Sequence, residues 1–67
     1  MRPNNQSLDA ARRHIYQAMS AYAAGDTIRG MTEEIQALNT ARRSRLPRVV
    51  KIVRGELEAA PRTVKDE

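Results

Sequence analysis

Apolar residues recur along this 67-residue chain at intervals of three and four positions, which is the period of an amphipathic α-helix. In the first third of the chain these positions are Leu8, Ala11, Ile15, Met19 and Tyr22. Ser7 precedes them as a favourable N-cap, and Gly25 follows them as a natural helix stop. The pattern predicts a first helix near residues 8–24, preceded by a short flexible tail over residues 1–6.

The second predicted helix is shorter. Met31, Ile35 and Leu38 give it an apolar face, and Thr32 is its expected N-cap. Gly30 is expected to interrupt the chain before that cap, after a short turn at residues 26–28. Because Arg42 is the next residue on the apolar face, the helix is predicted to end near residue 43.

The third predicted helix has the clearest periodicity. Its apolar residues fall within an arc of about 100°, and they are Leu46, Val49, Val50, Val53, Leu57 and Ala60. Pro47 suits a first helical turn, Ser44 is the expected cap, and Pro61 ends the pattern. We expect a helix near residues 46–60 and a short flexible tail over residues 61–67.

Residues 32–60 also fit a different arrangement, a single long helix kinked at Pro47. A proline inside a helix costs about 3 kcal/mol or more, which favours two helices joined by a tight turn. No stretch alternates apolar and polar residues for long enough to predict a strand. The predicted fold is therefore a small all-α domain of three helices, spanning residues 1–67.

The composition predicts a thin core and argues for a second copy of the chain. The chain has no Cys, Phe or Trp and a single His, so its core is aliphatic and thin, and neither a metal nor another cofactor is expected. Chains of this size often need a second copy for stability. We therefore expect a homodimer, with the valine-rich third helix or the alanine-rich first helix as its seam.

Positive charge is concentrated in one segment. Residues 35–55 contain no Asp or Glu, whereas the rest of the chain carries six Lys and Arg against eight acidic residues, a net charge of −2. The six cations of the segment are Arg42, Arg43, Arg45, Arg48, Lys51 and Arg54. Three interpretations are open: a surface for nucleic acid, a surface for an acidic protein, or a solvated face.

The order of elements favours DNA among these interpretations. Arg48 and Lys51 would point away from the apolar stripe of the third helix, beside Gly55, which leaves room for a close approach. A helix, a short turn and a basic helix is the layout of helix-turn-helix proteins. RNA is disfavoured because the segment has no aromatic residue for base stacking, and a membrane surface is disfavoured by the valine-rich apolar face.

A sequence resemblance points the same way. The run Val49–Gly55, followed by Pro61 and by Thr63 and Val64, resembles the recognition helix and following turn of helix-turn-helix repressors, and residues 27–29 and 34–35 are similar to the opening helix of that motif. The resemblance implies that Arg48 and Lys51 face the DNA groove. It implies that Arg42, Arg43 and Arg45 contact phosphates.

An enzyme is not expected. His14 lies beside two arginines and has no cysteine to act with, and Glu33 and Glu34 are adjacent and point apart on a helix. No phosphate-binding or dinucleotide motif is present, and no small-molecule substrate is expected. The N-terminal residues lack the apolar stretch of a signal peptide, and no run is long enough to span a membrane, so we expect a cytoplasmic protein.

Two apolar residues fall off the predicted stripes, Ile52 and Tyr16. We interpret them as interface contacts, together with Val53 and Leu57 on the third helix. The favoured function is a small DNA-binding transcriptional regulator that uses its basic third helix. The alternative is a protein-interaction module, such as an inhibitor, antitoxin or adaptor, whose basic face docks on a target.

The register of the third helix predicts the effect of Val53→Asp. Because this substitution places a carboxylate in the middle of the apolar stripe, we expect it to unfold the chain or to split its dimer. Circular dichroism and sedimentation measure the two effects. A folded, dimeric variant would show that the register is wrong.

Overall fold

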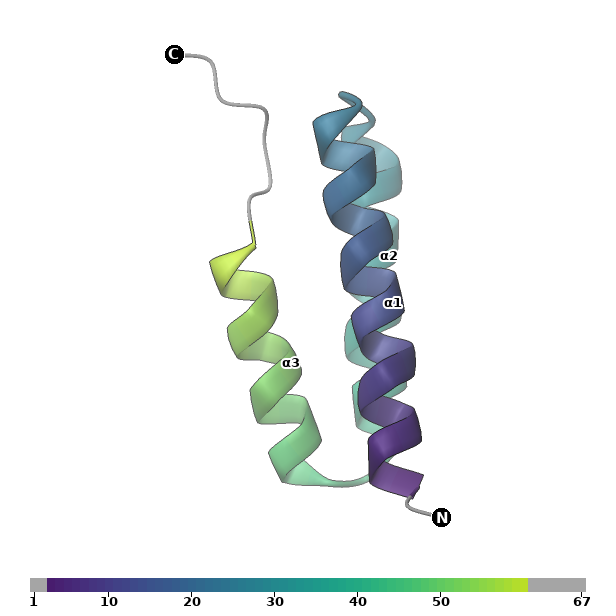
Figure 1. Cartoon of the computed structure of the whole chain (residues 1–67), viewed down its shortest axis with the longest axis vertical. Coiled ribbons are helices and arrows are strands. Elements are labelled where there is room, and N and C mark those ends of the chain that lie inside the picture. Colours follow the sequence, from purple (N-terminus) through teal and green to yellow (C-terminus); the bar gives the residue numbers. More distant parts are fainter. Residues whose placement is uncertain (1–2, 61–67) are drawn as a thin grey trace.

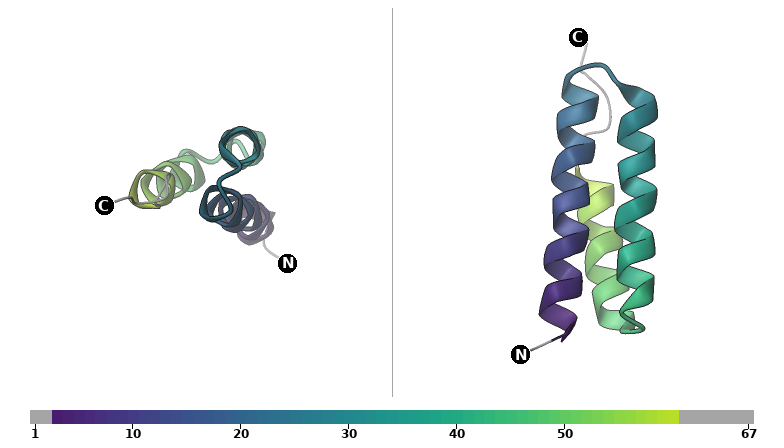
Figure 2. Two further views of the ribbon diagram at one scale, coloured as in Figure 1. Left: turned by 90° about the horizontal axis from the view of Figure 1, so that it is seen from above. Right: turned by 90° about the vertical axis from the view of Figure 1, so that its right-hand side faces the viewer.

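The computed structural model describes residues 3–60 and consists of three helices, α1 (Pro3–Ala23), α2 (Thr27–Arg43) and α3 (Pro47–Ala59) (Figure 1). The helices run along a common direction, with α2 antiparallel to both of the others (Figure 2). The all-α, three-helix fold class predicted from the sequence is confirmed. The predicted tail over residues 61–67, with Pro61, Thr63 and Val64, lies outside the described residues, as do residues 1–2.

Helix α1 begins earlier than the sequence pattern predicted. Residues 3–6 belong to the helix, so Ser7 lies inside it rather than at its N-cap. Proline is favoured in a first turn because its missing N–H would have no partner there, which explains a start at Pro3. The predicted stop is correct: Gly25 follows the helix with φ of 83°, a conformation that glycine adopts without steric cost.

Helix α2 also begins earlier than predicted, at Thr27. Asp26 is its N-cap, and its Oδ1 accepts a hydrogen bond from the Arg29 backbone N–H at 3.1 Å. Thr32, the expected cap, lies inside the helix, where its hydroxyl donates to the Ile28 carbonyl at 3.0 Å. Aspartate caps a helix at least as well as threonine, which explains why α2 begins directly after Asp26.

Gly30 does not interrupt α2 because it serves the packing of the first two helices. It is buried, and a Cβ built on it would lie 2.5 Å from Cε1 of the Tyr22 ring. The buried residues of α2 are Gly30, Ala37 and Ala41. The predicted apolar face of α2 is therefore wrong in part: Met31 and Ile35 are exposed, and Leu38 alone packs against the edge of the core.

Residues 32–60 form two helices, as the sequence favoured, and not one kinked helix. The turn between them corrects one detail, because Ser44 is the C-cap of α2 and Leu46 is the N-cap of α3. Pro47 occupies the first turn of α3 as predicted. At the other end, Ala60 has an extended conformation with ψ of 141°, which is typical of a residue that precedes proline.

The core consists of small side chains that all three helices contribute. Its members are Ala11, Ile15, Ala37, Ala41, Val49, Val53 and Leu57, with Leu8, Met19, Leu38 and Val50 packed at its edge. The stripes predicted for the first and third helices thus face inward, with one correction: Leu46 is 37% exposed and lies outside the core. The largest side chains that are fully buried are two valines, Val49 and Val53.

Replacing either of two glycines by alanine should change the free energy of unfolding, in opposite directions. Gly30→Ala should lower the free energy of unfolding by about 1–3 kcal/mol because its methyl group overlaps the buried Tyr22 ring. Gly55→Ala should raise it by about 0.5–1 kcal/mol, since nothing lies within 4 Å of the added Cβ and alanine is the better helix former. Thermal unfolding of both variants measures the difference. Equal midpoints would contradict the close contact of α1 and α2.

Candidate nucleic-acid interface

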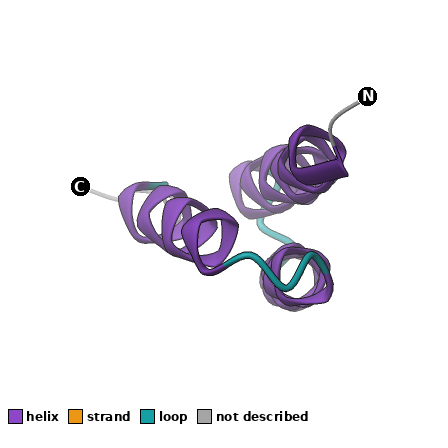
Figure 3. Ribbon diagram, turned by 90° about the horizontal axis from the view of Figure 1, so that it is seen from below, coloured by secondary structure: helices purple, strands orange, loops and turns teal. Residues whose placement is uncertain are grey.

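Four arginines surround the connection between α2 and α3, namely Arg42, Arg43, Arg45 and Arg48. We call this group the basic turn. Figure 3 looks onto the end of the molecule where the two helices are joined. All four residues are exposed. The remaining two predicted site residues, Lys51 and Arg54, are also exposed and lie further along α3.

None of these six residues forms an ion pair within the described part of the chain. The ion pairs among residues 3–60 join Arg12 to Glu56 at 2.6 Å, His14 to Glu33 at 2.7 Å and Arg29 to Glu33 at 3.9 Å. None of them involves the basic turn, Lys51 or Arg54. The cations of the segment therefore present a positive surface to solvent, and exposed charges of one sign sum to a field that attracts polyanions.

Local hydrogen bonds fix the backbone of the basic turn. The Ser44 hydroxyl donates to the Ala41 carbonyl at 2.6 Å and accepts from the Leu46 backbone N–H at 3.1 Å. The Arg45 N–H donates to the Arg42 carbonyl at 3.0 Å. These contacts hold Arg45 at φ of 61°, a left-handed conformation that costs a non-glycine residue about 1–2 kcal/mol.

Further along α3 the surface is mixed in charge. A shallow groove there is lined by Pro47, Val50, Lys51, Arg54, Gly55 and Glu58. Gly55 leaves open space on this side of the helix, as the sequence suggested. Glu58 brings an acidic group next to the two cations, so the positive surface weakens toward the C-terminal end of α3.

The helix arrangement differs from the geometry of helix-turn-helix readers. In those proteins the two helices of the motif cross at about 90–120°, whereas here α2 and α3 run nearly antiparallel (Figures 1 and 2). Within residues 3–60, no helix therefore projects from the bundle as a recognition helix would.

The predicted interface residues separate into two groups. Val53 and Leu57 are buried in the core of the single chain, so they present no surface to a partner. Ile52 remains partly exposed on α3, and Tyr16 on α1 is 71% exposed. Only these two are placed where a partner can reach them.

A polar contact between α1 and α2 was missed in the sequence. The Nδ1 atom of His14 lies 2.7 Å from Oε1 of Glu33, which is 12% exposed. The amide nitrogen of Gln17 donates to both Glu33 carboxylate oxygens at 3.1 Å in the orientation that satisfies both groups. Glu33 thus links the two helices, and the spacing of residues 14 and 17 on one side of α1 was the only signal of this link in the sequence.

A second interhelical link joins α1 to α3. The Arg12 guanidinium donates from Nε to both carboxylate oxygens of Glu56 at 3.1 Å and from Nη2 at 2.6 Å. This hydrogen bonding raises the pKa of Arg12 above its ordinary value. Both residues lie on the surface, so the pair orients α3 on α1 more than it stabilises the fold.

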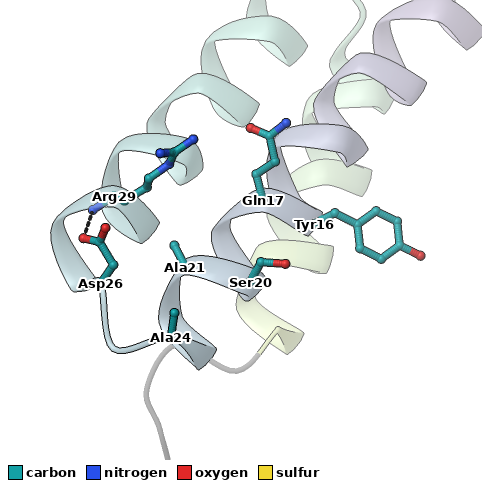
Figure 4. A pocket seen from close by; sticks show the side chains of 7 residues that line it. All are labelled: Tyr16, Gln17, Ser20, Ala21, Ala24, Asp26 and Arg29. Carbon is teal, nitrogen blue, oxygen red and sulfur yellow. Dashed lines mark hydrogen bonds between the residues drawn. The ribbon is translucent and has the colours of Figure 1, made fainter.

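At the opposite end from the basic turn, α1 and α2 border a hollow (Figure 4). Its lining is Tyr16, Gln17, Ser20, Ala21, Ala24, Asp26 and Arg29. Asp26 already caps α2, and the Tyr16 ring points away from the hollow. Its polar groups therefore do not pair a nucleophile with a base.

Residues 3–60 offer neither a metal site nor a membrane-spanning helix. No cluster of three metal-ligating side chains occurs among them, and none of their helices is long and apolar enough to cross a membrane. Comparison of the chain with protein-family models, curated protein sequences and solved structures finds no match.

Proposed function

We propose that this protein is a small DNA-binding regulator that acts without chemistry, through phosphate contacts made by the basic turn and by Lys51 and Arg54. One observation carries the proposal: six exposed cations lie in a stretch without an acidic residue, and none forms an ion pair within residues 3–60. Duplex DNA is the abundant polyanion whose regularly spaced phosphates suit such a surface.

The cations of the turn and those of α3 have different roles in this proposal. Arg42, Arg43 and Arg45 project from the turn and bind phosphate oxygens, for which the planar guanidinium group is well suited. Arg48 and Lys51 follow on the outer side of α3, where the absence of a side chain at Gly55 permits a close approach of the DNA backbone. Contacts of this kind position a protein on DNA and carry little sequence information.

The backbone of Arg45 gives independent support. Glycine would occupy its left-handed position with less strain, so stability does not explain an arginine there. Residues held in strained conformations are concentrated at functional sites. A long, exposed cation on a backbone fixed by hydrogen bonds fits a residue that contacts a ligand.

A second candidate function is a protein-interaction module that docks on an acidic target. The observation that favours it is the exposure of apolar side chains, since Tyr16 is 71% and Ile28 78% exposed, and such residues serve as anchors in protein interfaces. The two functions differ in salt dependence, because phosphate contacts respond steeply to salt whereas apolar anchors do not.

Fluorescence anisotropy with a random DNA duplex across a salt series tests the DNA proposal. We expect binding at low salt whose logarithm falls linearly with the logarithm of salt concentration, by about 0.9 per phosphate contacted. Arg48→Ala combined with Lys51→Ala should reduce this slope by about 2 and weaken binding at every salt concentration.

The matched control is Arg13→Ala combined with Arg29→Ala, which removes two exposed arginines outside the segment and so leaves the same net charge. It should bind more tightly than the α3 variant. Equal losses in the two variants would show that net charge alone drives binding, and no binding by the unaltered protein at low salt would exclude the DNA function.

Arg45→Gly should have opposite effects on DNA binding and on stability. Because glycine relieves the left-handed strain, the variant should unfold at an equal or higher temperature, with a gain of up to about 1 kcal/mol. Its DNA affinity should nevertheless fall, since one phosphate contact is lost. Thermal unfolding and anisotropy measure the two effects; unchanged affinity would remove Arg45 from the proposed site.

A further inference from the structure

Three large apolar side chains lie uncovered along α2. Ile28, Met31 and Ile35 are 78%, 53% and 57% exposed. Their spacing of three and then four residues places them on one side of the helix, and we call them the α2 stripe. Scattered exposed apolar residues are ordinary on a protein surface, but a contiguous group on one helix face indicates an interaction site.

The packing of the bundle explains why the stripe is uncovered. Helix α1 packs on the small residues of α2, Gly30 and Ala37, which lie on the opposite side from the stripe. Helix α3 reaches only the edge of this face, where Leu38 packs against the core. Within residues 3–60, the stripe therefore faces away from α1 and is covered by neither neighbouring helix.

We propose that the α2 stripe is the self-association surface of this protein, and that two copies pair through it with their α2 helices antiparallel. In this pairing Ile28 of each copy packs against Ile35 of the other, and the two-fold axis passes near Met31. Spacing of three and four residues is the spacing at which two helices bury a common apolar seam. A two-fold dimer uses the same patch on both copies, which matches three apolar residues arranged symmetrically about Met31.

Charge selects the antiparallel orientation. In residues 26–45, the acidic side chains all lie in the first half, at Asp26, Glu33 and Glu34. The charged side chains of residues 35–45 are all arginines. Arg42 continues the line of the stripe, seven residues after Ile35. A parallel pair would place the two Arg42 side chains against each other, which like charges disfavour. An antiparallel pair keeps the two Arg42 side chains at opposite ends of the seam.

The area of the stripe limits the strength of this dimer. Specific interfaces bury about 800 Å² on each partner, and a face one helix wide provides less than that. The expected product is a weak, reversible dimer. Val49, Val53 and the buried alanines of α1, Ala11, Ala18 and Ala21, are already used within the single chain, so they cannot form the seam of a dimer.

Sedimentation equilibrium of the full chain, from about 1 µM to about 1 mM, tests the proposal over the affinities that small interfaces have. The unaltered protein should shift from the mass of one chain to that of two. Ile35→Asp should remain a monomer throughout. Gln36→Asp adds the same charge at the adjacent, exposed position about 100° around the helix, and it should dimerise like the unaltered protein.

Circular dichroism should show the same helix content in all three proteins, since Ile35 contributes little to the core. A monomer at every concentration for the unaltered protein would overturn the proposal, even if the stripe binds some other molecule. Equal dimerisation of Ile35→Asp would also overturn it by placing the seam elsewhere.

Disulfide formation tests the orientation, because the chain has no cysteine of its own. A mixture of the Ile28→Cys and Ile35→Cys proteins should form mixed disulfides under mild oxidation. Arg42→Cys alone should form none, since the antiparallel arrangement separates its two copies by about 30 Å at 1.5 Å per residue. Rapid disulfide formation by Arg42→Cys would show a parallel pair. Sedimentation and disulfide formation are both measured without DNA, so their results do not depend on the proposed DNA-binding function.

Discussion

The close contact of α1 with α2 is the constraint on which the rest of the structure depends. It requires residues without bulk, and the two helices supply Ala11, Ala18, Gly30, Ala37 and Ala41, all of them buried. The Tyr22 ring fills the space over Gly30. Because small residues permit close approach but bury little surface, the core is thin. The same contact fixes the rotation of α2 and so decides which of its side chains reach solvent.

Sequence periodicity predicted two helices well because their apolar faces are the buried ones. It failed on α2, where the larger apolar residues, Met31 and Ile35, are outside and the alanines are inside. Hydrophobicity alone ranks isoleucine above alanine as a core residue, but the fit between two helices depends on volume as well. The sequence also predicted that Gly30 interrupts the chain before the second helix. It does not reveal that the Tyr22 ring lies against this glycine.

The residues of the candidate site could be predicted from the sequence, but not their conformation. Charge segregation is a property of the sequence, so the six cations could be identified without a structure, and all six are exposed. What could not be predicted is the conformation of Arg45, because its strain arises from the turn that joins two packed helices. Glu58 lies beside Lys51 and Arg54 and limits the strongest positive surface to the turn; its spacing of four and seven residues from these cations already indicated this on the predicted helix.

The two proposals have a joint geometrical consequence. In the antiparallel dimer, the two copies of Arg42 lie about 30 Å apart along the helix axes, so the two basic turns are at opposite ends of the assembly. One turn of duplex DNA is about 34–36 Å long, which is close to that separation. A dimer would then contact phosphates on successive helical turns, and each basic turn would raise the effective concentration of the other at the DNA. Weak contacts at two ends can in this way give useful affinity without a projecting recognition helix.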